Sequence, residues 1–508
     1  MTDAPLSSRR HALTRRTLLA GALVAPGGAV LAGCTGEEPR DPGSNARSND
    51  RPPNTEADIF DLTLHRTDQY RPFELVAPGF AAAEVGTVAP GHGPLTLHTK
   101  GPEAPFAAVE ARLPSARGAL ALGLATDDGD DHVLVRWTAQ SSRVTLEVRT
   151  GGRTRVLRRR KAALGGGAGL AFAVCENQVT ALVDTGDGWQ PLITERDKVS
   201  ALVDLRNETT LARFRYAWGT TGVTASDVRA GLFGMTGVRD PHLVQHADGS
   251  PYERNGRRFL TWTCAGLGFF QQAHWTVWSF DPAAPRDMRL EAQLFSRRDG
   301  LVLGDHAGQL VRHRDRWLVA TSSWGDFAPG NIHIRHAETG ADLLSGVHLI
   351  DTEPTSLPTE HGTWDPSLLL LDGSWRVAFV ESRSQDPFDF HPSLAGGPEG
   401  SADPWSGDLE LVAAADDLNQ CEGPIFAEVG SETWLLASDK FGQNYPVFDL
   451  DGRRRGRLDA PYGTNIPHPQ LVPDPGGGWW MVTFEDTQYA EDVMGYGGHG
   501  DVVLMHSV

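Results

Sequence analysis

Short apolar runs separated by polar and glycine-rich breaks dominate the chain, and no long stretch has helical periodicity. Between residues 58 and 232 these runs alternate apolar and polar positions, as at 132–137, 144–149 and 179–183. Period-two alternation with β-branched residues is typical of half-buried antiparallel strands. An all-β fold is therefore expected, and we predict a jelly-roll-type β-sandwich over residues 58–232.

A different pattern begins at Arg-Asp-Pro-His-Leu-Val, residues 239–244. It recurs as Trp-Asp-Pro-Ser-Leu-Leu at 364–369, Glu-Gly-Pro-Ile-Phe at 422–426 and Pro-His-Pro-Gln-Leu-Val at 467–472, with a looser copy at 305–311. Each copy precedes a second apolar run that carries an aromatic residue. Five such units at uneven spacing predict a five-bladed β-propeller over residues 233–508. A second sandwich is the alternative.

The repeat has a chemical consequence if the propeller is correct. The first strand of every blade lines the axis, so the polar residues at the starts of these strands converge at one mouth of the channel. In order they are Asp240, Ala307 with His306 beside it, Asp365, Glu422 and His468. Clustered carboxylates repel each other and are costly to desolvate, so they indicate proton chemistry or a metal.

These motifs resemble those of the five-bladed propeller glycosidases, above all glycoside hydrolase family 43, over residues 236–508. The resemblance rests on the two Asp-Pro motifs and the Glu-Gly-Pro motif in that order, on blades one, three and four. It implies that Asp240 is the general base, that Asp365 tunes and orients, and that Glu422 is the general acid. It also implies that His468 holds one axial divalent cation, calcium.

Two features depart from that family. The predicted sandwich precedes the propeller, whereas accessory sandwiches in the family usually follow it. Arg-Asp-Pro also occurs in fructosidase relatives, where it supports a transition state and another aspartate attacks. Inverting enzymes place their two carboxyl groups about 6.5–9.5 Å apart and retaining enzymes about 5–5.5 Å. Because Asp240 and Glu422 lie on blades that are not neighbours, we expect inversion. We also expect the charge of Asp365, beside Glu422, to favour a protonated Glu422.

Substrate contacts are expected from loops that combine flat apolar faces with amides. Trp364 is the first candidate for stacking against a sugar ring, and His306 either helps to hold the axial ion, touches a sugar hydroxyl or is structural. The other candidates are Phe270, Gln272, Trp324 and Asn444. Most remaining tryptophans are expected in the blade cores. In the sandwich, Trp137, Trp189, Tyr216 and Trp218 are either glycan platforms or core residues.

The predicted function is hydrolysis of glycosidic bonds in an extracellular polysaccharide. The resemblance favours furanosides, arabinan or arabinogalactan first, and xylan-type polymers second. Two alternatives stay open: a retaining fructosidase-like or transglycosylating enzyme, and a non-catalytic surface protein that binds glycan. The formal net charge of −19 argues against nucleic acid as a partner and suits a neutral polymer.

The N-terminus is predicted to direct export. Residues 1–34 combine a twin-arginine motif, a short apolar run and Leu-Ala-Gly-Cys, which resembles a lipobox with Cys34 as the lipidated residue. Residues 35–57 are polar and rich in Pro and Gly, as in a flexible tether. We therefore expect a monomeric lipoprotein on the outer face of the bacterial membrane, attached only through its lipid. The three remaining cysteines are not expected to form a required disulfide.

Overall fold

The structure is a computed structural model that describes residues 57–91, 95–328, 331–405, 407–463, 465–487 and 498–507. Within these ranges no helix is long and apolar enough to cross a membrane. The predicted signal segment with Cys34, and all of the predicted tether except residue 57, lie outside the described residues.

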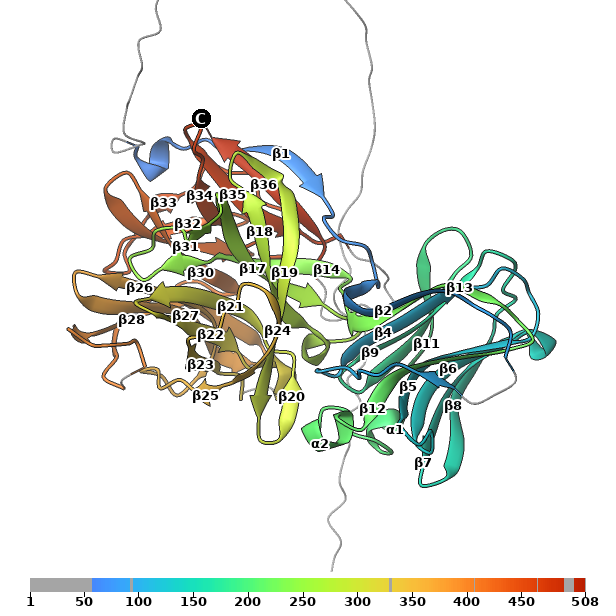
Figure 1. Ribbon diagram of the computed structural model, residues 1–508. Coiled ribbons are helices and arrows are strands. Elements are labelled where there is room, and N and C mark those ends of the chain that lie inside the picture. Colours follow the sequence, from blue (N-terminus) through green and yellow to red (C-terminus); the bar gives the residue numbers. More distant parts are fainter. Residues whose placement is uncertain are drawn as a thin grey trace, which may run out of the picture. The chain divides into compact units, whose positions relative to one another are not determined.

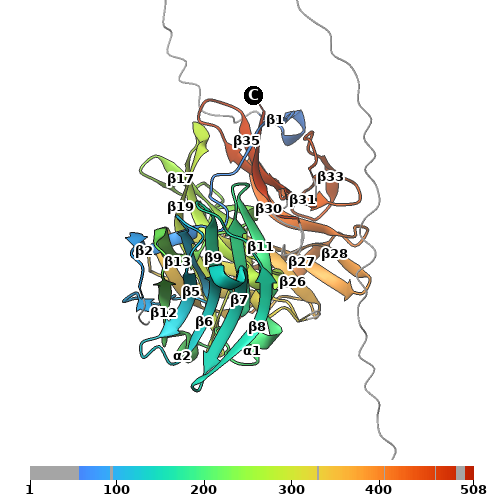
Figure 2. The same cartoon turned by 90° about the vertical axis from the view of Figure 1, so that its right-hand side faces the viewer.

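Residues 78–233 form two facing β-sheets of six strands each. The largest cluster of buried apolar side chains among the described residues lies between these sheets. Figure 2 shows strands of the second sheet side by side. The first sheet has the order β11 (Trp189–Glu195), β10 (Gln178–Asp184), β9 (Gly169–Cys175), β4 (Phe106–Arg112), β13 (Ala225–Phe233) and β2 (Pro78–Val88). The second has the order β3 (Thr96–Leu97), β12 (Phe214–Thr221), β5 (Ala119–Thr126), β6 (His132–Thr138), β7 (Arg143–Thr150) and β8 (Arg153–Lys161). The predicted sandwich is confirmed, while the jelly-roll type stays a prediction.

The described residues also contain short helices, all of them outside the sheets. They are η1 (Ile59–Asp61), η2 (Ala139–Ser141), α1 (Asp197–Ser200), α2 (Glu208–Leu211), η3 (Phe270–Gln272) and η4 (Trp324–Asp326). In the sandwich core, Trp137, Tyr216 and Trp218 are all buried. Since their rings are not exposed, the interpretation of these three as core residues holds.

From residue 237 onward the chain forms most of five largely antiparallel sheets, the blades of the predicted propeller (Figure 1). Their innermost strands contact one another in a closed ring, in chain order. Blade one contains β14 (Gly237–Leu243), β17 (Arg257–Ala265), β18 (His274–Asp281), β19 (Ala284–Arg298) and β20 (Leu301–Leu303), with β16 (Glu253–Arg254) on β17 and β24 (Gly346–Asp351) on β19. Blade two contains β15 (Gln245–His246), β21 (His306–His313), β22 (Arg316–Ser322), β23 (Ile334–Thr339) and β25 (Glu353–Pro354). The pairs of β15 with β21 and of β19 with β24 are parallel.

The other three blades have four strands each. Blade three contains β26 (Gly362–Leu371), β27 (Ser374–Gln385), β28 (Phe388–Glu399) and β29 (Glu410–Ala414). Blade four contains β30 (Cys421–Val429), β31 (Glu432–Asp439), β32 (Pro446–Phe448) and β33 (Arg454–Arg457). Blade five contains β34 (Gln470–Pro473), β35 (Trp479–Glu485), β36 (Asp501–Ser507) and β1 (His65–Tyr70).

Blade five corrects one predicted boundary. Residues 58–70 were predicted to belong to the sandwich, but β1 pairs antiparallel with β36 as the outer strand of the last blade. Figure 1 shows this blue strand beside red β36. Three apolar residues just before β1 pack against the same part of the propeller. Ile59, Leu62 and Leu64 are buried between blades four and five. Residues 59–70 therefore complete blade five together with β34, β35 and β36.

Apolar side chains pack between neighbouring blades around the whole ring. One cluster joins blades one and five, and others join one with two, two with three, three with four, and four with five. The aromatic residues of the second strands supply much of this packing: Trp262, Trp317, Trp375 and Trp479 are buried. The prediction that these tryptophans are blade core is confirmed. The thiols of Cys175, Cys264 and Cys421 are free and buried, so no disulfide joins these three residues.

The closure by the N-terminal segment can be tested at Leu64, which is 1% exposed. Leu64→Ala is expected to lower the free energy of unfolding by about 2–5 kcal/mol, because it leaves a cavity between blades four and five. Chemical denaturation measures the change. The matched control is Leu411→Ala on the outer strand of blade three, where Leu411 is 47% exposed, and a change within about 0.5 kcal/mol is expected. Equal effects of the two substitutions would contradict the closure.

Candidate functional site

A β-bulge recurs at the start of the inner strand in blades one to four. The strand register shifts between Arg239 and His242, and at the equivalent places in β21, β26 and β30. The residue inside each bulge has a positive φ angle, 53° at Asp240 and 50° at Asp365. Non-glycine residues rarely adopt this conformation, and aspartate tolerates it better than most. The bulge therefore aims one side chain of each blade differently from those of a regular strand.

The bulge positions define a ring around the axis, which we call the axial ring. Its members are Asp240, Ala307, Asp365, Gly423 and, by its place two residues before Gln470, His468. All five line one small cavity of about 10 Å³, which is about the size of one water-sized sphere. The predicted convergence of the strand starts is thus observed for Asp240, Ala307, Asp365 and His468.

The predicted equivalence is off by one position in blade four. The residue that matches Asp240 there is Gly423, while Glu422 matches Arg239, His306 and Trp364. The proline that follows Asp240 and the one that follows Gly423 would have given this alignment. The carboxyl group of Glu422 nevertheless reaches the others, since its Oε1 lies 3.9 Å from Nε2 of His468. That nitrogen is also 3.4 Å from Asp240 Oδ1 and 3.5 Å from Asp365 Oδ2.

Arg239 connects two of the predicted catalytic carboxyl groups. Its Nε donates to Asp240 Oδ1 at 2.7 Å and its Nη2 donates to Glu422 Oε1 at 2.9 Å. The guanidinium also lies over the ring of Phe484, 5.2 Å from its centre. The prediction gave Arg239 no role, although it stands directly before Asp240. Buried acids need a cation nearby, and this role of Arg239 could have been predicted from the sequence on that ground.

The three carboxyl groups differ in environment. Burial would raise the pKa of Asp240, but Arg239, His468 and His306 together lower it below its ordinary value. The pKa of Asp365 is raised to about 8, first by burial and then by the charges of Glu422 and Asp240. This raised pKa favours the protonated form of Asp365 near neutral pH, and the expected effect of its charge on Glu422 stays a prediction. Burial lowers the pKa of His468, yet Asp240 and Asp365 raise it overall.

Asp365 and Trp364 both position Glu422. Oδ2 of Asp365 accepts a hydrogen bond from the backbone N–H of Gly423 at 3.1 Å. Nε1 of Trp364 donates to Oε2 of Glu422 at 3.3 Å. With Arg239 on its other oxygen, the Glu422 carboxyl is held on both sides, while its side chain keeps 12% exposure. Glu422 is the least buried of the three acids and the one that a ligand at the mouth meets first.

The predicted substrate contacts have mixed outcomes. Trp364 is only 1% exposed, so it is not open for stacking in this structure. Gln272 is also 1% exposed, and its Oε1 accepts from the Phe269 backbone N–H at 2.6 Å within η3. Asn444 lies in the turn after β31, beside the end of that strand. Trp364 and Gln272 are therefore too buried to contact a sugar in this structure.

A cluster of aromatic rings flanks the acids at blades two and three. His306 stacks on Trp324, with ring centres 5.6 Å apart and planes 11° apart. Phe270 lies 4.5 Å from Trp324 and 4.9 Å from Phe327. Burial and the nearby Arg239 lower the pKa of His306 to about 4, against the opposite effect of Asp240. A neutral His306 thus forms part of the aromatic wall.

A divalent cation has a candidate donor set here. Asp365, Glu422 and His468 each offer one ligand atom, and these atoms lie within 4.8 Å of one another. Carboxylate oxygens and an imidazole nitrogen suit several divalent metals, whereas calcium prefers six to eight oxygens. The residues fit a cation whose remaining ligands come from water or substrate.

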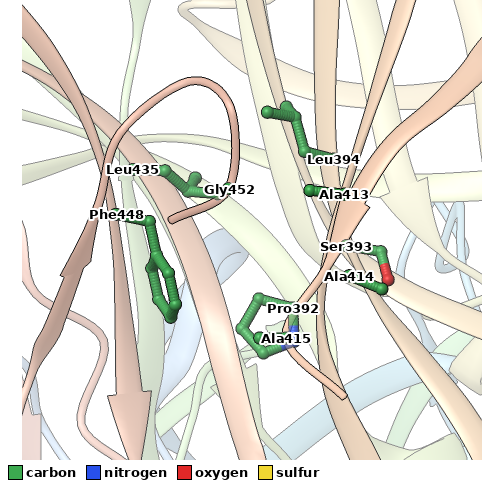
Figure 3. A pocket seen from close by; sticks show the side chains of 9 residues that line it. All are labelled: Pro392, Ser393, Leu394, Ala413, Ala414, Ala415, Leu435, Phe448 and Gly452. Atoms are coloured by element: carbon green, nitrogen blue, oxygen red, sulfur yellow. The ribbon is translucent and has the colours of Figure 1, made fainter. Parts of the chain in front are cut away.

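A second hollow, between blades three and four, has no such chemistry. Its volume is about 10 Å³ and nearly all of its lining is apolar (Figure 3). It is lined by Pro392, Ser393, Leu394, Ala413, Ala414, Ala415, Leu435, Phe448 and Gly452. We interpret it as imperfect packing between two blades.

Comparisons with protein-family models and with curated proteins found no match. Among solved structures, the chain is similar to a family 117 glycoside hydrolase from the marine bacterium Zobellia galactanivorans (10% identity, 54% of this chain and 86% of that one, TM-score 0.38). It is also similar to a GH43_1 enzyme from Xanthomonas citri (14%, 53% and 87%, 0.38). A third is an α-L-arabinanase from Penicillium chrysogenum complexed with arabinobiose (12%, 67% and 90%, 0.34). These proteins are of the kind that the sequence motifs resemble. At such identities and TM-scores, the likenesses by themselves assign no activity to this chain.

The proton on Asp365 predicts a pH dependence of stability. Because its pKa is raised in the folded state, the folded protein binds a proton that the unfolded chain releases above about pH 4. This contribution is complete at low pH and is lost as the pH rises towards about 8. Between pH 4.5 and 6 the free energy of unfolding is expected to fall with pH more steeply in the parent than in Asp365→Asn, by up to about 1.4 kcal/mol per pH unit.

Denaturant titrations at several pH values, with a chelator present, measure the two slopes. That interval keeps His468 protonated in both folded and unfolded states, so the difference reports on position 365. Asp372→Asn, on an exposed hairpin turn, is the control substitution. Equal slopes in the parent and in Asp365→Asn would contradict a protonated Asp365.

Proposed function

We propose that the chain is a glycoside hydrolase that cleaves an extracellular polysaccharide. The observation that carries the proposal is the meeting of Asp240, Asp365 and Glu422, from three different blades, around Arg239 and His468. Glycoside cleavage needs one carboxyl group to protonate the leaving oxygen and another to activate water or to attack carbon. This cluster supplies both groups at the mouth of a propeller axis.

The environments of the acids support distinct roles. Arg239 and His468 lower the pKa of Asp240, which suits a carboxylate that activates water. Glu422 is the most accessible acid, and Trp364 and Arg239 fix its two oxygens, which suits the group that meets the leaving oxygen. Asp365 holds the backbone at Gly423, so it orients Glu422 and does not itself need to reach the substrate.

Inversion is the outcome that we propose first, because the base and the acid come from blades that are not neighbours. One observation favours retention as the second candidate. A single guanidinium reaches both carboxyl groups, at 2.7 and 2.9 Å, and draws them closer than their blades alone would indicate. A short separation suits an attacking carboxylate and a covalent intermediate.

The proposed substrate is a furanosidic polymer, arabinan or arabinogalactan first and xylan second. The motif resemblance to family 43 supports this choice. Exposed aromatic faces at the mouth also suit sugar rings: Phe269 is 39% exposed beside the η3 loop, and Phe441 is 69% exposed after β31. Because the N-terminus carries twin-arginine and lipobox motifs, we propose that the enzyme acts at the outer face of the bacterial membrane.

The acid and base assignments predict large losses of activity. Glu422→Gln and Asp240→Asn are each expected to lower kcat on arabinan by about 10²–10⁴-fold, because each removes a proton-transfer group. Reducing-sugar release over a panel of plant and bacterial polysaccharides measures the effect. Glu428→Gln is the matched control, since Glu428 lies on the same strand as Glu422 but is exposed. Undiminished release by Glu422→Gln would sink the assignment, and an inactive parent would favour a non-catalytic glycan-binding protein.

The anomeric configuration of the first-formed product decides between the two mechanisms. Proton NMR of the reaction in its first minutes should show the inverted sugar before mutarotation. Retained configuration would overturn inversion and would favour the fructosidase-like alternative.

We further propose that one divalent cation, calcium in the first instance, binds between His468, Asp365 and Glu422. The support is their donor geometry, with one ligand atom of each residue within 4.8 Å of the others. A bound cation would supply positive charge that holds the acids in place. The chain's own residues would still carry the proton transfers.

Calcium is therefore expected to stabilise the folded protein. An ion present at 100 times its Kd adds about 2.7 kcal/mol to the free energy of unfolding. Thermal unfolding with calcium and with chelator should show a shift that His468→Ala removes. His246→Ala, at an exposed site in blade two, should keep the shift. A parent with no shift for calcium would rule out this cation, and other divalent ions can be tested in the same way.

A further inference from the structure

A polar cavity lies where the sandwich meets the propeller. The described residues from 57 onward belong to one compact unit, and the cavity inside it has a volume of about 210 Å³. The sandwich side contributes Glu176, Asn177, Arg196, Ser200 and Arg206. The propeller side contributes Gln271 and Gln272 from η3. Every one of these side chains is polar, so the cavity does not suit an apolar ligand.

The sandwich elements are firmly attached at this place. An apolar cluster that includes Phe106 and Cys175 of the sandwich and Leu267 and Phe295 of blade one joins the two parts. The Glu208 backbone N–H donates to the Gly300 carbonyl, and the Val302 N–H donates to the Arg206 carbonyl. The cavity is therefore a built feature of the fold, with walls from both parts.

Two oxygens in its walls have no hydrogen-bond donor among the described residues. They are Oε1 of Glu176, a residue 2% exposed, and Oε1 of Gln271. Burial raises the pKa of Glu176 well above its ordinary value, against the opposite effect of Arg206. Leaving a buried polar group without a partner is costly. Both oxygens need a partner that brings donors.

The cationic groups in the walls are already neutralised. Arg206 binds both oxygens of Asp204, at 3.0 and 2.9 Å, and Nε of Arg196 lies 3.2 Å from Asp197. A ligand therefore gains little from carrying negative charge. The walls suit a neutral molecule with several hydroxyl groups. The space is many times the roughly 10–15 Å³ that one water needs by the same measure, enough for one sugar ring.

The same loop serves the candidate active site. Phe270 follows Phe269 and precedes Gln271, and its ring packs on Trp324 in the aromatic wall beside the acids. A ligand bound to Gln271 would thus sit behind the wall that flanks the mouth. This connection gives the sandwich a place in substrate binding without any exposed aromatic platform.

We propose that this cavity binds one sugar residue of the polysaccharide, at a distance from the bond that is cleaved. The inference rests on the proposed function and adds to it a second binding site, half of which the sandwich provides. Hydroxyl groups of the sugar donate to Glu176 and Gln271, and its oxygens accept from the arginine and asparagine side chains. Long chains that reach both sites bind more tightly than short ones.

A blocking substitution tests the site. Ser200 is exposed at the end of α1 and lines the cavity, so Ser200→Tyr fills it from the rim. Lys198→Tyr places the same ring on an exposed site of the same helix outside the lining, and is the matched control. On arabinan, Ser200→Tyr is expected to raise KM about tenfold at unchanged kcat, as for the loss of uniform binding. On arabinobiose, which cannot span both sites, it should change neither constant.

Binding to an inactive protein checks the result without turnover. In the Glu422→Gln background, calorimetry with arabinohexaose should show about tenfold weaker binding when Ser200→Tyr is added, and none of this loss with Lys198→Tyr. Gln271→Leu, which removes one of the two oxygens without filling the cavity, should weaken binding in the same direction. Thermal unfolding verifies that each variant is folded. Equal affinities for the Ser200 and Lys198 variants would overturn the proposal and leave a cavity that holds water only.

Failure of the proposed function gives a different outcome. If the parent cleaves no polysaccharide, saturation-transfer NMR with L-arabinose, D-xylose and D-galactose tests the cavity directly. A signal that Ser200→Tyr removes and Lys198→Tyr keeps would support the sugar site in a non-catalytic protein. No signal for any of the three sugars, or one that both variants keep, would overturn it.

Discussion

The balance of charge around Arg239 is the constraint on which the axial cluster depends. Two carboxyl groups from blades one and four, with Asp365 behind them, are buried where isolated charges would be very costly. Arg239 donates to Asp240 and to Glu422, and His468 lies within 4 Å of all three acids. The acids can gather only because these two cations are present. The cations are held in turn by blades one and five, so the ring of blades must be closed for the cluster to form.

The backbone supplies the second part of the arrangement. A bulge in the same place in four blades puts Asp240, Ala307, Asp365 and Gly423 into the left-handed region. Alanine in this conformation is strained, and its methyl side chain has no chemical function that would require the strain. Hydroxyls from the neighbouring blade satisfy the backbone here: Thr263 accepts from the Ala307 N–H and Ser322 from that of Asp365. Each blade thus fixes the start of the next inner strand, and the acids inherit their positions from this order.

The sandwich and the N-terminal strand give the propeller what five blades alone lack. β1 covers the outer edge of blade five, where an open edge would expose unpaired backbone groups. The sandwich packs against blade one and ends beside η3, the loop that carries the aromatic wall. An accessory sheet therefore reaches the loop nearest the candidate site. The polar lining of the cavity between the sandwich and this loop indicates that the sandwich does more than shield an edge of the propeller.

Much of the fold could be predicted from the sequence. Alternating runs predict the sandwich, and a phrase repeated five times predicts the propeller, because local periodicity follows from strand geometry. The gathering of Asp240, Asp365, Glu422 and His468 follows from the repeat as well. Only the tertiary structure places Gly423 and not Glu422 in the axial ring, buries Trp364, gives Arg239 its two partners and assigns β1 to the last blade. Those facts depend on contacts between residues far apart in the chain. Burial and pairing across blades, which no local pattern records, set which side chain holds a proton.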